Sequence, residues 1–377
     1  MMKIGFDAKR VFYNNTGLGN YSRNVIYSLS ENYVKNQYIL YTPSKRFTEN
    51  ISDKNHQKNI FIKTPRSDLY KLPVLNSYWR RKNVIQDLIK DDIDIYHGLS
   101  NELPHKISKS GIKSIITIHD LIFIRYPHLF SKIDRLIYMK KTIQGCSESD
   151  KIIAVSEQTK QDIMKFLNIK EDKIKVIYQG CNAIFQKTIP KKEQDQICKK
   201  YNLPSRFILS VGSIEERKNL LLILKSLRKL QNEQLVVIGN GGHYKEKCIN
   251  YIHKHHLENR VIFLNNLTTQ EIASIYQKSN IMIYPSIFEG FGIPILESLF
   301  SKTPVITSKE GCFKEVGGKY SIYIDPSSTE ELIHAIEKIN KEEDYRENMI
   351  KNGWKHAQNF TNEKVSCNLM KTYESLI

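Results

Sequence analysis

The chain has 377 residues, which is too long for one small domain and fits two domains that each have a hydrophobic core. Its six cysteines are scattered without a C-x-x-C pair, and it contains neither a long apolar stretch nor a signal-peptide core, so a zinc site, a disulfide scaffold and a membrane-spanning helix are not expected. The net charge of +17 allows an anionic substrate or lipid, but no nucleic-acid-binding motif accompanies it, so nucleic acid is not an expected partner. We therefore expect a cytoplasmic protein.

Apolar runs typical of strands alternate with helical spacings along the whole chain. In the first half we expect strands at residues 3–8, 37–42, 93–98, 114–120 and 151–156, and helices at 20–32, 84–92 and 157–168. In the second half we expect strands at 206–212, 234–239, 260–264, 280–287 and 303–308, and helices at 219–230, 243–255, 269–279 and 294–302. Such alternation predicts an α/β fold with parallel sheets that are covered on both faces.

A polar, lysine-rich segment at residues 183–204 separates the two halves, and we place the inter-domain linker there. The prediction is therefore two doubly wound, Rossmann-like domains at residues 1–187 and 188–359.

The most informative segment is residues 289–297, with the sequence Glu-Gly-Phe-Gly-Ile-Pro-Ile-Leu-Glu, between an expected strand and an expected helix. Ligands bind at such loops in open α/β sheets, because glycines admit a ligand close to the backbone and a helix N-terminus attracts an anion. Glu289 and Glu297 would repel phosphate alone, but carboxylates suit the hydroxyl groups of a sugar or ribose. The segment therefore indicates a sugar nucleotide, although a solvated loop acid and a first-turn helix acid would produce the same pattern.

Two cations, Arg217 and Lys218, immediately precede an expected helix, where the helix dipole favours acids instead. Cations at that place suit a diphosphate leaving group, and a solvated basic pair is the alternative.

In the first half, Gly17 and Gly19 lie in a turn after the first strand, where their backbone amides could approach a ligand. His97, His119 and Asp120 lie at the carboxyl ends of strands, where open sheets bind ligands. An ordinary glycine turn and structural buried histidines are the alternatives.

Residues 289–297, followed by Thr-Pro-Val-Ile at 303–306, resemble the Glu-x7-Glu motif of retaining glycosyltransferases with the GT-B fold. The resemblance is to family 4, also called group 1, and to its mannosyltransferase-like branch; it extends through most of the chain and is strongest at 211–326. It implies two Rossmann-like domains that face each other across a cleft, with a C-terminal helix at about 360–377 that packs back on the first domain.

The resemblance also implies a role for each candidate residue. His119 and Glu289 would hold the transferred sugar as the catalytic residues, and Glu297 would bind the ribose. Tyr21, His97 and Asp120 would lie on the acceptor side. The donor phosphates would be held by Gly17, Gly19, Arg217, Lys218, Gly290, Phe291, Gly292 and Ile293.

The expected reaction is transfer of a hexose, with retention, from a nucleoside-diphosphate sugar to a hydroxyl of a saccharide or lipid-linked saccharide in cell-surface polysaccharide synthesis. GDP-mannose is the first expectation for this co-substrate, and neither a cofactor nor a metal is expected because the two cations would stabilise the leaving group. A UDP-sugar-dependent transferase or a sugar-nucleotide epimerase of the same fold is an alternative. A basic nucleic-acid-binding protein is a distant one.

Basic and aromatic residues interleave at residues 63–82, a composition that suits an anionic membrane surface. They are Lys63, Arg66, Tyr70, Lys71, Tyr78, Trp79, Arg80, Arg81 and Lys82. This segment predicts peripheral association with the inner face of the cytoplasmic membrane, and a solvated basic surface is the alternative.

Overall fold

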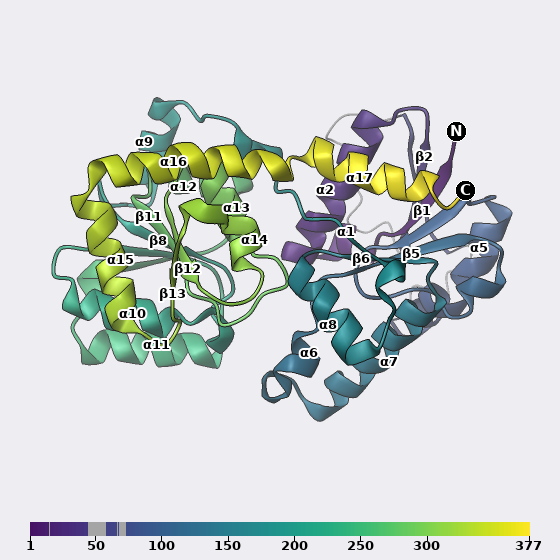
Figure 1. Cartoon of the computed structure of the whole chain (residues 1–377), viewed down its shortest axis with the longest axis horizontal. Coiled ribbons are helices and arrows are strands. Elements are labelled where there is room, and N and C mark those ends of the chain that lie inside the picture. Colours follow the sequence, from purple (N-terminus) through teal and green to yellow (C-terminus); the bar gives the residue numbers. More distant parts are fainter. Residues whose placement is uncertain (15, 44–57, 66, 68–72) are drawn as a thin grey trace. The chain divides into compact units, whose positions relative to one another are not determined.

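The computed structural model describes residues 1–14, 16–43, 58–65, 67 and 73–377. The chain forms two compact units (Figure 1). The first consists of Met1–Gly180 together with Thr361–Ile377, and the second of Cys181–Phe360. Among the described residues, no helix combines the length and the apolar character needed to cross a bilayer.

The first unit contains a seven-stranded parallel sheet in the order β3-β2-β1-β4-β5-β6-β7. Its strands are β1 (Lys3–Asp7), β2 (Gln37–Tyr41), β3 (Ile60–Lys63), β4 (Ile95–Gly98), β5 (Lys113–Ile118), β6 (Lys151–Ala154) and β7 (Ile174–Val176). The strand order reverses between β1 and β4, and such a reversal is where open α/β sheets bind ligands. Alternate strand residues enter separate apolar layers, so that Leu40 packs on one face of the sheet and Ile39 on the other.

The helices of the first unit are α1 (Lys9–Tyr13), α2 (Gly17–Asn32), α4 (Pro73–Tyr78), α5 (Val84–Lys90), α6 (Ile122–Arg125), α7 (Lys132–Glu148), α8 (Glu157–Leu167) and α17 (Asn362–Glu374). A π-helical turn, η2 (Trp79–Asn83), joins α4 to α5. The C-terminal helix α17 packs against α2 (Figure 1). Ser28 Oγ donates to the Asn362 carbonyl at 2.8 Å, and Asn32 Nδ2 to Ser366 Oγ at 3.1 Å.

The second unit contains a six-stranded parallel sheet in the order β10-β9-β8-β11-β12-β13. Its strands are β8 (Ile208–Val211), β9 (Leu235–Ile238), β10 (Val261–Leu264), β11 (Ile281–Tyr284), β12 (Val305–Ser308) and β13 (Ile322–Ile324). Here the strand order reverses between β8 and β11. The reversal places the ends of these two strands side by side although they are far apart in sequence.

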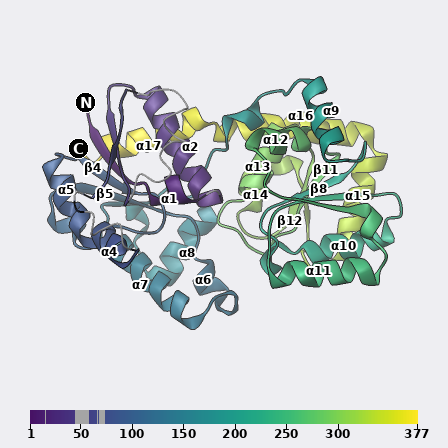
Figure 2. The same cartoon turned by 180° about the vertical axis from the view of Figure 1, so that it is seen from behind.

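Helices cover both faces of this second sheet (Figure 2). One layer holds α10 (Leu220–Lys229), α11 (His243–Lys254) and α15 (Thr329–Lys341), and the other holds α9 (Lys191–Lys200), α12 (Thr269–Lys278) and α13 (Ile293–Phe300). The remaining helices are α14 (Phe313–Gly317) and α16 (Glu343–Ala357), of which α16 packs on α13. Short 3-10 turns complete both units: Ile107–Lys109, Pro127–Leu129, Glu171–Lys173, Ala183–Gln186, Glu216–Lys218, Glu258–Arg260, Gly318–Tyr320 and Gln358–Phe360.

The expected linker at 183–204 is wrong in its character. These residues include α9, which packs on α12 as part of the second unit. Asp195 pairs with Lys278 at 2.6 Å, and Gln194 Nε2 donates to Gln277 Oε1 at 3.1 Å. The polar composition reflects a surface helix that buries only Ile197, so polarity alone misled the prediction.

A buried ion pair lies at the carboxyl end of β1. Arg80, from the π-helical turn, pairs with Asp7 and reaches Glu102 at 3.4 Å. Burial raises the pKa of Asp7, but the charge and hydrogen bonds of Arg80 outweigh it and hold the pKa below its usual value. Trp79 is likewise buried and donates to Asp87 at 2.8 Å. Trp79 and Arg80, two members of the basic-aromatic pattern, are therefore structural.

Replacing Arg80 with alanine should destabilise the first unit by about 3 kcal/mol, because Asp7 would remain buried without its cation. Arg81→Ala is the matched control, since Arg81 is exposed and its removal should change stability by less than about 0.5 kcal/mol. Urea unfolding followed by circular dichroism measures both. Equal stabilities of the two variants would contradict a structural role for Arg80.

Candidate functional site

The carboxyl ends of β8 and β11 bring three candidate residues together. These strands are neighbours, with Ile281 paired to Ile208 and Met282 to Leu209. Arg217 and Lys218 lie in the 3-10 turn Glu216–Lys218 after β8, and Glu289 lies in the loop after β11. The site therefore occupies the reversal point of the second sheet, as expected for ligand binding in an open α/β fold.

Four side chains converge on one oxygen of the buried Glu289 carboxylate, Oε1. Lys218 Nζ lies at 2.5 Å and Arg217 Nη1 at 2.6 Å. The hydroxyl groups of Ser286 and Tyr284 donate to the same oxygen at 2.6 and 2.9 Å. Lys218 Nζ also contacts the Tyr284 hydroxyl. We call these five residues the Glu289 cluster.

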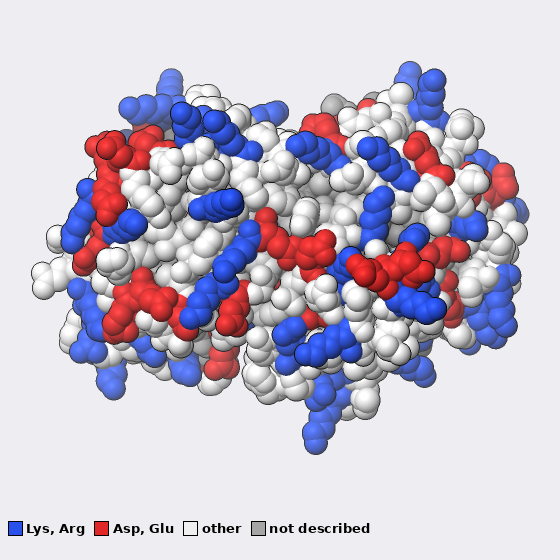
Figure 3. All heavy atoms as spheres, viewed as in Figure 1, with Lys and Arg blue, Asp and Glu red and all other residues white. Residues whose placement is uncertain are grey.

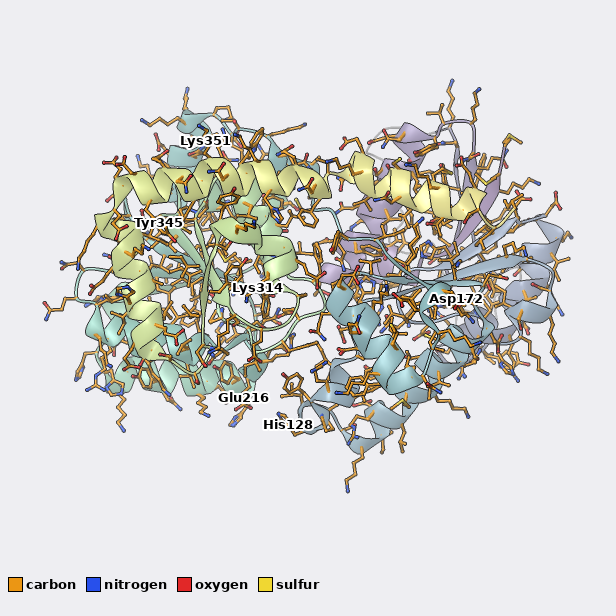
Figure 4. All side chains as sticks on the ribbon, viewed as in Figure 1. His128, Asp172, Glu216, Lys314, Tyr345 and Lys351 are labelled. Atoms are coloured by element: carbon orange, nitrogen blue, oxygen red, sulfur yellow. The ribbon has the colours of Figure 1, made fainter. Side chains whose placement is uncertain are left out.

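The electrostatics of the Glu289 cluster keep its carboxylate ionised. Burial raises the pKa of Glu289, but Lys218 and Arg217, together with the hydrogen bonds, lower it to about 2. Arg217 is further held by the Phe288 carbonyl and by Glu215, each at 2.6 Å. The neighbouring Glu216 is exposed and points away from the unit (Figure 4). The buried Glu289 carboxylate thus positions both cations, and Glu215 and the Phe288 carbonyl also hold Arg217.

The glycine loop after Glu289 leads directly into α13. Gly292 caps this helix with φ of 99°, a left-handed conformation that a residue with a Cβ rarely adopts. The Cys312 thiol lies 3.2 and 3.1 Å from the carbonyl oxygens of Glu289 and Phe291. The Phe291 ring packs on Phe360 with centroids 5.9 Å apart, so its side chain is part of the core. Any ligand contact of this loop would therefore come from backbone.

Glu297 lies in the second turn of α13, beyond the first-turn position that the helix-dipole alternative requires. Tyr276 of α12 donates to its Oε2 at 3.1 Å. Burial raises the pKa of Glu297 to about 8, and the Tyr276 hydrogen bond offsets only part of this effect. Glu289 and Glu297 therefore differ in charge at neutral pH although they flank the same loop.

In the first unit, His119 follows β5 and has protein partners at both ring nitrogens. Nε2 lies 2.8 Å from the Leu99 carbonyl, which can only accept, so Nε2 carries the proton. Nδ1 then accepts from Gln179 Nε2 at 3.2 Å. Burial lowers the pKa of His119 to about 4, which makes it neutral at physiological pH. Asp120 accepts from the Ile122 amide at 3.1 Å and supports the loop.

His97 and Tyr21, for which acceptor-side roles are expected, are both buried. His97 is completely buried between Tyr373 of α17 at 2.7 Å and Thr117 of β5 at 2.8 Å. The Tyr21 hydroxyl lies 3.2 Å from the same Thr117 Oγ1, and its ring packs edge-on against His119. Tyr21 therefore packs against His119 directly, and His97 is linked to Tyr21 through Thr117. Sequence position at a strand end does not reveal which of these side chains points inward.

Gly19 is also corrected. Its amide donates to Asn14 Oδ1 at 3.1 Å, and a Cβ would lie 1.7 Å from the Asn14 carbonyl oxygen. Gly19 is therefore required for close packing of α2 on the preceding turn, and its amide is already used. Gly17 begins α2, and no neighbouring atom would obstruct a Cβ there.

Sequence reasoning missed the partners that hold the candidate residues. Tyr284 and Ser286 directly precede the Glu289 motif, so their proximity in sequence could have identified them. Tyr276, Gln179 and Tyr373 are distant from the residues they contact, and only the fold brings them there. Among the described residues, no group of histidine, cysteine and acidic side chains is arranged to hold a metal ion.

Two family models match the chain. A model described as Glycosyl transferases group 1 matches residues 192–356, and one described as Glycosyltransferase Family 4 matches residues 17–183. O-antigen chain mannosyltransferase B of Escherichia coli is 25% identical over 100% of both chains. O-antigen chain mannosyltransferase RfbU of Salmonella typhimurium is 29% identical over 60% of each chain.

Solved structures share the fold at low identity. Anabaena Alr3699/HepE, solved in complex with UDP and glucose, has a TM-score of 0.77 and 17% identity, covering 100% of both chains. WaaG, a glycosyltransferase involved in lipopolysaccharide biosynthesis, has a TM-score of 0.71 and 13% identity, covering 98% of each. Together with the two doubly wound sheets, these matches confirm the predicted GT-B fold class. The chain belongs to the group 1 glycosyltransferases, family 4.

Replacing Glu289 with glutamine should destabilise the second unit by about 3 kcal/mol at neutral pH, because Lys218 loses its carboxylate partner and Arg217 keeps only Glu215. The folded pKa of about 2 lies below the unfolded value of about 4.3, so this stabilisation is complete above the unfolded pKa and is lost as pH falls through the folded one. The difference between wild type and variant should therefore shrink below pH of about 4. Chemical unfolding at several pH values measures it.

Glu216→Gln serves as the control for this experiment, because the exposed Glu216 carboxylate is adjacent in sequence to Arg217 but outside the Glu289 cluster. It should follow the wild-type curve. A Glu289→Gln variant as stable as Glu216→Gln at pH 7 would contradict the electrostatic role of Glu289.

Proposed function

We propose that this glycosyltransferase moves a hexose, with mannose the first candidate, from a nucleoside-diphosphate sugar to a hydroxyl of a saccharide or lipid-linked saccharide. The Glu289 cluster at the strand reversal carries the proposal, because it combines two positioned cations with a sugar-binding acid at a ligand-binding edge. Similarity to two O-antigen chain mannosyltransferases supports mannose and a role in cell-surface polysaccharide synthesis. Such synthesis would place the protein in the cytoplasm.

The proposed task of Arg217 and Lys218 is to stabilise the leaving diphosphate. Arg217 is held by Glu215, Glu289 and the Phe288 carbonyl, and Lys218 is held by Glu289 and the Tyr284 hydroxyl. Both therefore need little reorganisation when charge develops on the departing phosphate. The backbone of Gly290, Gly292 and Ile293, at the start of α13, would add the favourable end of a helix dipole. These positive groups would meet the charge requirement for which many transferases use a divalent cation, so we propose a metal-independent reaction without a cofactor.

Glu289 is proposed to hold the hydroxyl groups of the transferred sugar and not to attack it. Four donors on Oε1 stabilise the negative charge of the Glu289 carboxylate and lower its pKa to about 2, which makes the group a weak nucleophile. We therefore favour attack by the acceptor hydroxyl on the face from which the diphosphate leaves. The acceptor oxygen bonds to the anomeric carbon, and the bond between this carbon and the phosphate oxygen of the donor breaks. The departing phosphate takes the acceptor proton.

His119 is proposed to orient the transferred sugar through a neutral imidazole. To bond a sugar hydroxyl, Nδ1 would exchange its contact with Gln179 for one with the ligand, while the Leu99 carbonyl keeps Nε2 protonated. A neutral ring suits this task, because it accepts from a hydroxyl without repelling the developing positive charge of the sugar.

Charge removal at the proposed donor site should abolish transfer. Arg217→Met and Lys218→Met should each lower kcat at least about 100-fold, in line with the loss of one transition-state contact. Glu289→Gln should have a similar effect. A panel of GDP-mannose, UDP-glucose, UDP-galactose and ADP-glucose, assayed by nucleotide release with added saccharide acceptors, identifies the donor and measures these losses.

Lys225→Met is the matched control, since Lys225 is an exposed cation on α10, the helix that follows Arg217 and Lys218. It should retain the wild-type rate. Addition of EDTA should also leave the rate unchanged, and a loss of activity restored by Mg²⁺ would contradict the metal-independent mechanism. Wild-type rates in Arg217→Met or Glu289→Gln would contradict the site.

Glu297 is proposed to accept hydrogen bonds from the ribose hydroxyls, which its ionised form does best. Since its pKa in the free protein is about 8, ligand binding should be coupled to loss of a proton. Affinity for the preferred nucleoside diphosphate should therefore rise with pH, by up to about tenfold per unit below pH 8, and level off above it.

Calorimetric titration of wild type and Glu297→Gln tests this coupling. The variant should bind more weakly and lack this part of the pH dependence, while ionisation of the diphosphate affects both proteins equally. Parallel pH profiles for the two proteins would contradict the ribose role.

A further inference from the structure

A basic pocket lies on the first unit, away from the residues assigned above. It has a volume of about 310 Å³ and is lined by Arg81, Lys82, His105, Lys140 and Gln144. Arg81 and Lys82 come from the π-helical turn, and Lys140 and Gln144 come from α7. Three cations around one concavity are the arrangement that binds a phosphate group.

The acidic groups near this pocket do not neutralise it. Glu148 accepts from Gln144 Nε2 at 3.3 Å and lies 3.2 Å from His105 Nδ1. The adjacent Lys141 is occupied by Glu102 at 2.8 Å. Arg81, Lys82 and Lys140 are all exposed, and Lys82 additionally lies 5.3 Å from the centre of the Tyr78 ring. One carboxylate therefore faces three lysine and arginine charges.

The same helix exposes an unusual amount of apolar surface. The side chains of Ile133 and Leu136 are 71% and 72% exposed, and those of Ile137, Tyr138 and Ile143 are also exposed. Positions 133, 136, 137 and 140 recur at helical spacing, so this apolar stripe runs toward Lys140 of the pocket. Soluble surfaces rarely gather large apolar side chains in this way unless they contact a partner.

Basic side chains also flank the apolar stripe. Lys132 and Arg135 begin α7, opposed on that turn by Asp134. Figure 3 shows lysine and arginine side chains gathered at the tip of the first unit where α6 and α7 lie in Figure 1, and Figure 4 shows the exposed His128 of the preceding turn at this tip. Apolar side chains with a basic surround match the interface of an anionic bilayer.

We propose that α7 docks on an anionic phospholipid bilayer. Ile133, Leu136 and Ile137 would enter the boundary between headgroups and acyl chains, while the pocket of Arg81, Lys82 and Lys140 receives a headgroup phosphate. This surface keeps Arg81 and Lys82 of the segment expected at 63–82, whereas Trp79 and Arg80 face inward and Arg66, Tyr70 and Lys71 lie outside the described residues. The proposal does not depend on which sugar is transferred.

Flotation with phospholipid vesicles tests the proposal on the full chain. Wild type should bind vesicles that contain phosphatidylglycerol and bind pure phosphatidylcholine vesicles at least about tenfold more weakly, with binding to the anionic vesicles reduced by salt. Leu136→Asp/Ile137→Asp removes the apolar contact, and Arg81→Ala/Lys140→Ala removes two pocket charges. Each should weaken binding to anionic vesicles at least about tenfold.

Matched controls come from exposed residues of the same unit outside α7 and the pocket. Val34→Asp replaces an apolar side chain that is 67% exposed, and Lys35→Ala/Lys90→Ala removes two exposed charges. Both should bind vesicles like wild type. Thermal unfolding checks folding, and all variants should keep the wild-type affinity for the nucleoside diphosphate, which separates this proposal from the donor site.

Four outcomes would overturn the proposal. Wild-type binding by either α7 or pocket variant would remove the corresponding contact. An equal loss of vesicle binding in the control variants would show that binding depends only on the net charge of the protein. Binding of soluble glycerol phosphate to the pocket without any vesicle binding would indicate a site for a free anion, and a stable complex between copies of the chain that α7 variants disrupt would indicate a protein interface.

Discussion

The second unit depends on the contact of one buried carboxylate oxygen with two cations. Removing Glu289, Arg217 and Lys218 from water is costly, and their mutual attraction and the hydroxyl groups of Tyr284 and Ser286 offset much of this cost. The contact is possible because β8 and β11 are adjacent where the strand order reverses. The charges that fix these strand ends are also the charges that a diphosphate and a sugar would meet.

In the first unit, neutral groups surround the candidate site residue His119. A chain of buried hydrogen bonds links Tyr373 of the C-terminal helix through His97 and Thr117 to Tyr21, whose ring packs on His119. Burial keeps both histidines uncharged, with pKa values of about 3 and 4. Because α17 packs on this unit, its Tyr373 is part of the hydrogen-bonded surroundings of His119, the side chain proposed to orient the sugar.

Much of the architecture could be predicted because its signals are local. The apolar runs of the parallel strands, the helical spacing of α10 and the glycine loop before α13 each reflect contacts within a few residues. The failures have a different origin. The segment that contains α9 was read as a linker because a surface helix with one buried residue is almost as polar as a loop. Arg80 resembled a membrane contact because the sequence shows its charge but not its ion pair with Asp7. Asp7 lies 73 residues earlier in the chain, at the end of β1.

By itself, the sequence determined the two-domain α/β class, the family and the positions of Arg217, Lys218, Glu289 and Glu297, because these depend on periodicity and on a short motif. The tertiary structure decided what those groups do to one another. It paired Glu289 with both cations, isolated Glu297 beside Tyr276 with a raised pKa, buried His97 and Tyr21, and left the apolar side of α7 exposed. Burial and long-range pairing set charge and accessibility, and neither quantity is encoded in the neighbouring residues of the chain.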